Sequence, residues 1–285
     1  MDADALRQQQ REEWSRCAPG WRRYRANFAG PSWPITERML DLARVRPGER
    51  ALDLACGTGN PSFDLADQVG PEGYVLGLDL APAMVETARA WARQRGVSNV
   101  EFQVVPDERR LGVEPGSFDV ATCRAGLQYM PEREAAVRAV FAALRPGGRF
   151  VAMTLGAPDL CQPFTLTNDI VARHAALPWM DPGDNPGPVG LSTVEQLEAV
   201  LTGAGFVDVK TDVLIAPIFE ADGPEQAWRL FTETAGPFIE LIGSLSGDKR
   251  RALDRDAVAT FAEAFPAGPV RPTGQALIAC GGKPA

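Results

Sequence analysis

A strand that runs directly into a glycine-rich loop constrains this chain more than any other feature. Residues 51–59 read ALDLACGTG, an apolar run that is typical of a buried strand, followed by Gly57 and Gly59 where a helix should begin. Glycines at such a place let a ligand approach the backbone amides of a helix N-terminus. Asp79 ends the next apolar run, where a carboxylate can accept both hydroxyls of a ribose. The pattern predicts a nucleoside site at the carboxyl end of a parallel sheet.

Further short apolar runs alternate with helical patterns along the chain. The runs that read as strands are 51–55, 74–80, 100–105, 118–123, 149–155, 206–215 and 273–282. Apolar residues at helical spacing predict a helix over 83–95 that Gly96 ends, and a second over 132–145 that the turn at 145–148 ends. Ser192 to Glu195 is typical of a capping box, residues 178–190 predict a loop, and 224–265 are helical in pattern. This succession predicts a doubly wound α/β fold with roughly seven strands and two helical excursions.

Composition narrows the class of ligand. The 285 residues carry a formal net charge of −8, which opposes nucleic-acid binding, and we expect a small-molecule ligand and no nucleic-acid partner. No apolar run is long enough to cross a bilayer, and residues 1–14 lack the apolar stretch of a secretory signal, so we expect a cytoplasmic protein that does not bind membranes. Five cysteines without a C-x-x-C spacing and a single histidine predict no metal site.

A dinucleotide fingerprint is the main rival interpretation of the glycine loop. That fingerprint needs a third glycine, which lets the helix approach the strand closely beside a pyrophosphate, and here Ser62 stands in its place. A nicotinamide-dependent oxidoreductase is therefore the less favoured alternative.

Motifs in a fixed order extend the pattern over nearly the whole chain. RPGER precedes ALDLACGTG, and GLDLAPAMVETAR, PGSFDVATCRAGLQYMP and LRPGGRF follow it. In this order the chain resembles the class I S-adenosylmethionine-dependent methyltransferases, especially the ubiquinone/menaquinone-biosynthesis-like (methyltransferase type 11) branch.

The resemblance implies a Rossmann-like, mostly parallel sheet with an antiparallel last strand and helical lid insertions. It implies one methyltransferase domain over 1–285: an N-terminal helical lid at 1–45, a cofactor-binding core at 46–155, substrate-pocket insertions at 156–192 and 223–266, and the last strand at 273–282. The implied reaction is C- or O-methylation of a quinol, phenol or natural-product-like molecule, by a monomer or homodimer. Another reaction that uses the same cofactor, such as a cyclisation, is the alternative, because fold does not fix function.

The resemblance also assigns residues of the cofactor site. Gly57 and Gly59 would pass beside the methionine part, and Asp79 would bind the ribose. Arg124 would lie near the methionine carboxylate or sulfonium. Asp107 falls where the family places an acidic residue for the adenine amino group, but this chain reads PDER against the family's D-A-E, which leaves the register of that loop open. The remaining assignments are backbone contacts from Ala55 and Cys56, Leu80 against the adenine, Glu108 beside Asp107, and Asp53 as a ligand or as a residue that only orients the loop.

The sequence indicates less clearly which residues contact the methyl acceptor. Gln128 and Tyr129 point toward the substrate or pack on the sheet, and Tyr129 and His174 are the candidate bases. His174, the lone histidine, is equally consistent with a structural role on an apolar helix. An aromatic cluster near the N-terminus predicts either a lid over the cofactor or an ordinary packed helix: Trp14, Trp21, Tyr24, Phe28 and Trp33. The candidates for substrate contact are Gln128 and Tyr129 together with Trp21, Tyr24 and Trp179.

Overall fold

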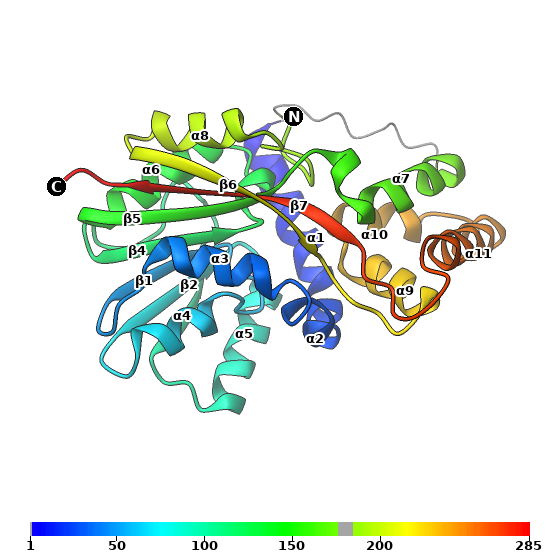
Figure 1. The fold of residues 1–285 in the computed structure, drawn as a ribbon, viewed down its shortest axis with the longest axis horizontal. Coiled ribbons are helices and arrows are strands. Elements are labelled where there is room, and N and C mark those ends of the chain that lie inside the picture. Colours follow the sequence, from blue (N-terminus) through cyan, green and yellow to red (C-terminus); the bar gives the residue numbers. More distant parts are fainter. Residues whose placement is uncertain (1, 176–184) are drawn as a thin grey trace.

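The computed structural model describes residues 2–175 and 185–285, which contain a seven-stranded sheet in the order β3-β2-β1-β4-β5-β7-β6 (Figure 1). The strands are β1 (Arg50–Leu54), β2 (Tyr74–Asp79), β3 (Val100–Val104), β4 (Phe118–Arg124), β5 (Leu144–Leu155), β6 (Val207–Pro217) and β7 (Thr273–Gly282). Strands β1 to β5 pair in parallel, and β7 runs antiparallel to both β5 and β6. The predicted doubly wound, mostly parallel sheet with an antiparallel last strand is confirmed.

Helices cover both faces of this sheet, which explains why its strands are apolar on both sides. One face carries α3 (Trp33–Ala43), α4 (Ser62–Val69) and α5 (Pro82–Arg95), and the other carries α6 (Arg133–Ala143) and α8 (Val194–Gly203) (Figure 1). Successive residues of β1 divide between the two cores, with Ala51 packed beside α3 and α4 and Leu52 packed beside α6 and α8.

The predicted helix ends lie at, or within two residues of, the ends in the structure. Gly96 ends α5 in a left-handed conformation with φ of 66°. The capping box is real but lies one residue later than predicted, because Thr193 caps α8 and Gln196 reciprocates. The helix predicted over 132–145 ends at Ala143, and β5 already begins at Leu144. The turn residues are accommodated inside the strand by a register shift against β4 and by the positive φ of Gly147.

A separate helical layer lies beyond the carboxyl ends of the parallel strands. It consists of α7 (Gln162–Ala175), α9 (Pro224–Thr234), α10 (Gly236–Gly243) and α11 (Gly247–Ala264), and it has an apolar core of its own that includes Trp228, Phe231 and Phe261. The N-terminal helices α1 (Ala3–Arg23) and α2 (Arg25–Ala29) lie between this layer and the sheet (Figure 1). A Cβ at Gly20 would lie 2.2 Å from the carbonyl oxygen of Glu233, so α1 touches the end of α9 at backbone distance.

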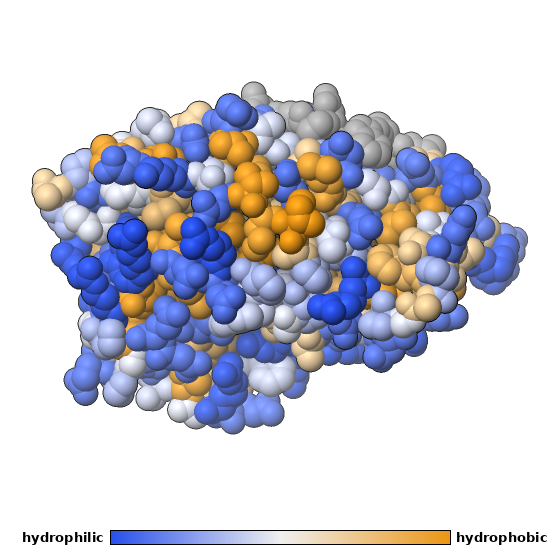
Figure 2. Space-filling view, viewed as in Figure 1, coloured by the Kyte–Doolittle hydropathy of each residue, from blue (hydrophilic) through white to orange (hydrophobic). Residues whose placement is uncertain are grey.

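The outer strand β6 leaves apolar side chains on the surface. Figure 2 shows them gathered over this strand on an otherwise largely polar face, and Val207, Val213 and Ile215 are the exposed apolar residues of β6. Within residues 2–175 and 185–285, no helix combines the length and the apolar content needed to cross a membrane.

Candidate active site

A cavity of about 320 Å³ opens where the strand order reverses between β1 and β4. Open α/β sheets bind ligands at this position, outside the carboxyl ends of the strands. Its wall combines residues that follow β1, β2 and β4 with residues of α1, α2 and α9, so the sheet provides one side and the helices close the other. Cavities of this size accept small organic ligands.

The glycine loop after β1 forms the floor of the cavity. Gly59 has a φ of 99°, and a Cβ there would lie 2.3 Å from the ring of Phe63, so any other residue would disrupt the loop. Gly59 does not itself line the cavity, unlike Gly57, so its role is to shape the turn. Gly57 has a φ of 54°, and a Cβ there would meet nothing within 4 Å. The backbone at Gly57 therefore faces open space, and this is the space that a bound ligand needs.

Asp53 of β1 links the start of α4, which follows the glycine loop, to β4. Its carboxylate accepts hydrogen bonds from Ser62 Oγ, at the start of α4, and from Thr122 Oγ1 of β4, at 2.5 and 2.9 Å. It is fully buried, and burial raises its pKa to about 7 despite these two donors. Asp53 does not line the cavity. Of its two predicted roles, the geometry supports orientation of the loop. Ser62 donates a hydrogen bond to Asp53, which a glycine at position 62 could not do with a side chain.

Asp79 stands beside the loop at the end of β2. One carboxylate oxygen accepts the N–H of Gly57 and the other accepts the N–H of Ala81, both at 2.8 Å. Burial raises the pKa of this carboxyl group. Each oxygen retains a further lone pair. Asp79 lines the cavity together with Leu80, so the two residues are placed to contact a nucleoside.

The two acidic residues after β3 have different positions. Asp107 does not line the cavity and pairs with Arg109, which holds the pKa of Asp107 at about 2. Glu108 does line the cavity, is buried, and binds Arg7 of α1 through two hydrogen bonds, the Nη2–Oε1 bond measuring 2.9 Å. Arg7 also reaches Glu132 at 2.8 Å, so α1 is fixed to the rim of the cavity. Of the predicted pair, only Glu108 is therefore available near a bound adenine.

Unpaired polar atoms gather in the wall on either side of the loop. Within the described part of the chain, Arg25 Nη1, Arg124 Nε and Asn60 Oδ1 are buried and have no hydrogen-bond partner. Arg124 is held by a 2.8 Å bond from Nη2 to Ser32 Oγ, and Arg25 lies over the rings of Phe63 and Trp91, at 5.3 and 5.5 Å from their centroids. Burial lowers the pKa of both arginines.

These atoms match one part of the cofactor that the resemblance implies. Buried donors and acceptors are normally satisfied, so unpaired ones in a cavity indicate a ligand. Two cationic donors suit a carboxylate, and an amide oxygen suits an ammonium group. The amino-acid part of S-adenosylmethionine carries both groups, and the site therefore fits it. Sequence reasoning assigned Arg124 to this place and missed Arg25 and Asn60.

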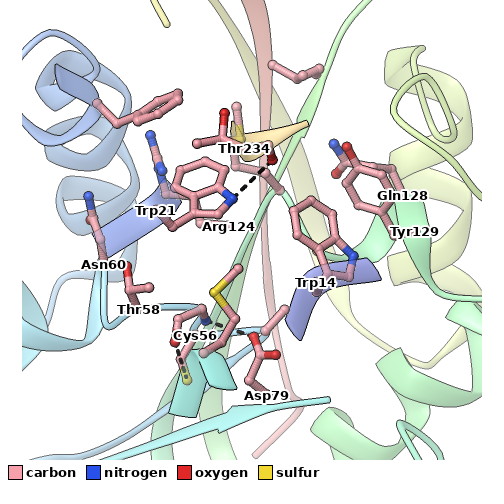
Figure 3. A pocket seen from close by; sticks show the side chains of 18 of the residues that line it. Trp14, Trp21, Cys56, Thr58, Asn60, Asp79, Arg124, Gln128, Tyr129 and Thr234 are labelled. Carbon is pink, nitrogen blue, oxygen red and sulfur yellow. Dashed lines mark hydrogen bonds between the residues drawn. The ribbon is translucent and has the colours of Figure 1, made fainter. Parts of the chain in front are cut away.

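Aromatic residues of α1 and α2 close the cavity above the loop. Trp14 meets the ring of Tyr129 edge to face with centroids 5.1 Å apart, and Trp21 donates from Nε1 to the carbonyl oxygen of Thr234 at 3.1 Å (Figure 3). Trp14, Trp21 and Phe28 line the cavity. Tyr24 does not, because it is buried with Phe219 and α9 instead. The N-terminal segment thus covers the site.

The candidate bases are separated by the structure. Tyr129 lines the cavity, but burial raises the pKa of its hydroxyl above the ordinary value for tyrosine, so the hydroxyl stays protonated. His174 does not line the cavity; its Nε2 lies within hydrogen-bond distance of Asp256 Oδ2, at 2.8 Å, in a contact between α7 and α11. Trp179 lies outside the described residues. Gln128 lines the cavity and is buried.

We expect His174→Ala to retain methyl transfer within about tenfold of the wild-type rate, because general-base catalysis typically contributes about 10²–10⁴-fold and His174 has no place in the cavity wall. Steady-state kinetics with saturating cofactor measure this. A thousandfold fall in turnover with unchanged cofactor affinity would identify His174 as the base.

Comparison with known proteins identifies the family. A family model described as a methyltransferase domain matches residues 46–193, slightly more than half of the chain. Demethylmenaquinone methyltransferase of Lactococcus lactis is 40% identical over 124 residues, a match that covers 44% of this chain and 47% of that protein, so the similarity extends over only about half of that relative. Nocamycin O-methyltransferase of Saccharothrix syringae is 30% identical over 270 residues, covering 85% of this chain and 92% of the relative.

Among solved structures, the [4+2]-cyclase SpnF shares the fold, with a TM-score of 0.56, 24% identity and coverage of 88% of this chain and 81% of that one. The fold, the cavity and these matches agree. The chain therefore belongs to the methyltransferase-domain family, the class I S-adenosylmethionine-dependent methyltransferases that its sequence resembles.

Proposed function

We propose that this protein transfers the methyl group of S-adenosylmethionine to carbon or oxygen of a small, largely apolar acceptor such as a quinol, a phenol or a related natural product. The observation that carries the proposal is that one cavity is lined by polar groups on one side and by aromatic side chains on the other. Polar groups suited to a nucleoside and an amino acid surround the glycine loop, and aromatic side chains of α1, α2 and α9 line the rest. The names of the relatives, one acting on demethylmenaquinone and one an O-methyltransferase, support the same class of acceptor.

In this proposal the cofactor is held at three places. Asp79 binds the ribose hydroxyls beside Leu80, and Glu108 lies nearest the adenine. The backbone of the loop from Ala55 to Thr58, which includes Cys56 and Gly57, contacts the methionine part. Arg25 and Arg124 bind the carboxylate, and Asn60 accepts from the ammonium group. Residues 1–285 would then form one domain, with 1–45 as its lid.

Bound S-adenosylmethionine supplies a methyl group that is already activated by a positively charged sulfur. The residues of this chain mainly align and enclose it, and alignment of this kind can contribute about 7–11 kcal/mol. Trp14 and Trp21 exclude water from above. Tyr129 stays protonated, so we propose that it acts as a packing surface and hydrogen-bond donor and that it does not remove a proton from the acceptor.

The proposal is tested by incubating the purified protein with S-adenosylmethionine and a panel of quinols, phenols and polyketide-like acceptors. We expect S-adenosylhomocysteine to form only when an acceptor is present, together with a product heavier by one methyl group in place of hydrogen. A product of unchanged mass without S-adenosylhomocysteine would indicate a cyclase. Binding of NAD(H) in place of either adenosyl compound would indicate an oxidoreductase. Either result would contradict methyl transfer.

A further inference from the structure

Gln128 is a fully buried residue whose side-chain amide stands out among the described residues for its lack of hydrogen bonds. It lies in the short helix η1 (Leu127–Tyr129) directly after β4, its exposed fraction is 0%, and it lines the cavity. Neither Oε1 nor Nε2 has a hydrogen-bond partner among the described residues. Figure 3 shows it beside Tyr129 and Trp14, across the cavity from Asn60 and Thr58. It therefore lies on the side away from the groups that suit the amino-acid part of the cofactor.

The surroundings of Gln128 hold it in place without satisfying its side chain. Its backbone carbonyl accepts the N–H of Gly187 at 2.8 Å, and a Cβ at Gly190 would lie 2.5 Å from that same carbonyl oxygen. Gly187 and Gly190 are thus packed tightly against the backbone of Gln128. Gln10, in the same cavity wall, differs because its Nε2 donates to the carbonyl oxygen of Tyr129.

A buried amide without a partner destabilises the folded protein unless a ligand satisfies it. The amide presents an oxygen acceptor and two N–H donors side by side, and it carries no charge. Its partner must offer the reverse pattern, a carbonyl oxygen next to an O–H or N–H, and must be neutral, because an amide does little to offset a buried charge. The aromatic rings of Trp14 and Tyr129 nearby suit a flat, apolar remainder of the molecule.

We propose that Gln128 is the specificity-determining residue for the methyl acceptor, and that it selects apolar ring compounds with a carbonyl oxygen beside an O–H or N–H group, as in a lactam or an enolised diketone. The inference rests on the proposed function, since it concerns the acceptor part of the same cavity.

The stability of the free protein gives the first test. Gln128→Leu keeps the approximate volume of the side chain and removes the unsatisfied amide, so we expect the Tm of the ligand-free protein to rise by about 2 °C or more. Gln10→Leu is the matched control, and its Tm should fall because the carbonyl of Tyr129 loses a donor. A fall for Gln128→Leu would show that the free protein already satisfies this amide, and would overturn the proposal.

Ligand binding gives the second test, on protein saturated with S-adenosylhomocysteine. The probes are 1H-quinolin-2-one, which has both groups, and 1-methylquinolin-2-one, which lacks the N–H; quenching of tryptophan fluorescence reports their binding. Wild-type protein should prefer the first by about tenfold or more, since a buried polar site rejects analogues that leave it unpaired. Gln128→Leu should abolish this preference and Gln10→Leu should retain it.

Equal binding of the two probes to wild-type protein, or a preference that survives in Gln128→Leu, would contradict the proposal. These failures are distinguishable from failure of the proposed function, because calorimetry with S-adenosylhomocysteine alone precedes them. If that compound does not bind, methyl transfer itself is wrong, whereas the Tm comparison still decides the state of Gln128.

Discussion

Replacing both Arg25 and Arg124 by methionine should lower the affinity for S-adenosylhomocysteine by about a thousandfold, since each charged hydrogen bond contributes about 1.5–3 kcal/mol. Both side chains have buried N–H groups without partners in the cavity wall, and both would bind the carboxylate of the ligand. The affinity for 5′-methylthioadenosine, which has the adenosine but no amino-acid part, should remain unchanged. Calorimetry on both ligands measures the difference directly.

Arg23→Met is the control, because Arg23 is an exposed neighbour paired with Glu233 and does not line the cavity. It should bind both ligands as the wild type does. If the double variant lost 5′-methylthioadenosine to the same extent, the arginines would be supporting the cavity as a whole. If it lost neither ligand, they would not contact the carboxylate.

Asp79→Ala should not discriminate between the two ligands: it should weaken the binding of both by about two to four orders of magnitude, because the ribose is common to them and two charged hydrogen bonds are removed. The substitution also leaves the N–H groups of Gly57 and Ala81 without an acceptor, so the Tm should fall as well. Differential scanning calorimetry and ligand titration separate the two effects.

Asp107→Ala provides the comparison for Asp79. Asp107 is a carboxylate near the same edge of the sheet, but it pairs with Arg109 outside the cavity wall, so its loss should leave both affinities unchanged. Weaker binding in Asp107→Ala would place Asp107 against the adenine and show that the loop after β3 differs from the arrangement described above.

The parts of the site that follow from sequence are those set by local motifs and sheet topology. Gly57 lies in the loop after β1, Asp79 ends the adjacent parallel strand β2, and adjacent strands bring such residues together in any fold of this kind. Glu108 and Asp107 are neighbours in one loop, and it is Glu108 that binds Arg7 of α1 at the cavity wall. Local sequence contains nothing that predicts this contact.

The positions of Arg25 and His174 show why sequence patterns do not predict the whole site. Arg25 reaches the cavity because Phe63 and Trp91 pack beneath its guanidinium group, and no motif in the N-terminal segment predicts those partners. His174 lies outside the cavity wall and contacts Asp256, which is distant in sequence and belongs to a different helix. Both positions depend on how helices from distant parts of the chain pack together, which side-chain periodicity does not encode.

The contact between α1 and α9 bears on how the protein is made. Trp21 and Thr234 are 213 residues apart in sequence, and β7, near the C-terminus, lies between β5 and β6. During synthesis the N-terminal helices leave the ribosome long before their binding partners exist, and contacts between such distant residues form slowly. We infer that a nascent chain cannot enclose the cofactor until α9 and β7 have been translated. Aromatic residues of α1, such as Trp14 and Trp21, would remain without some of their packing partners until then.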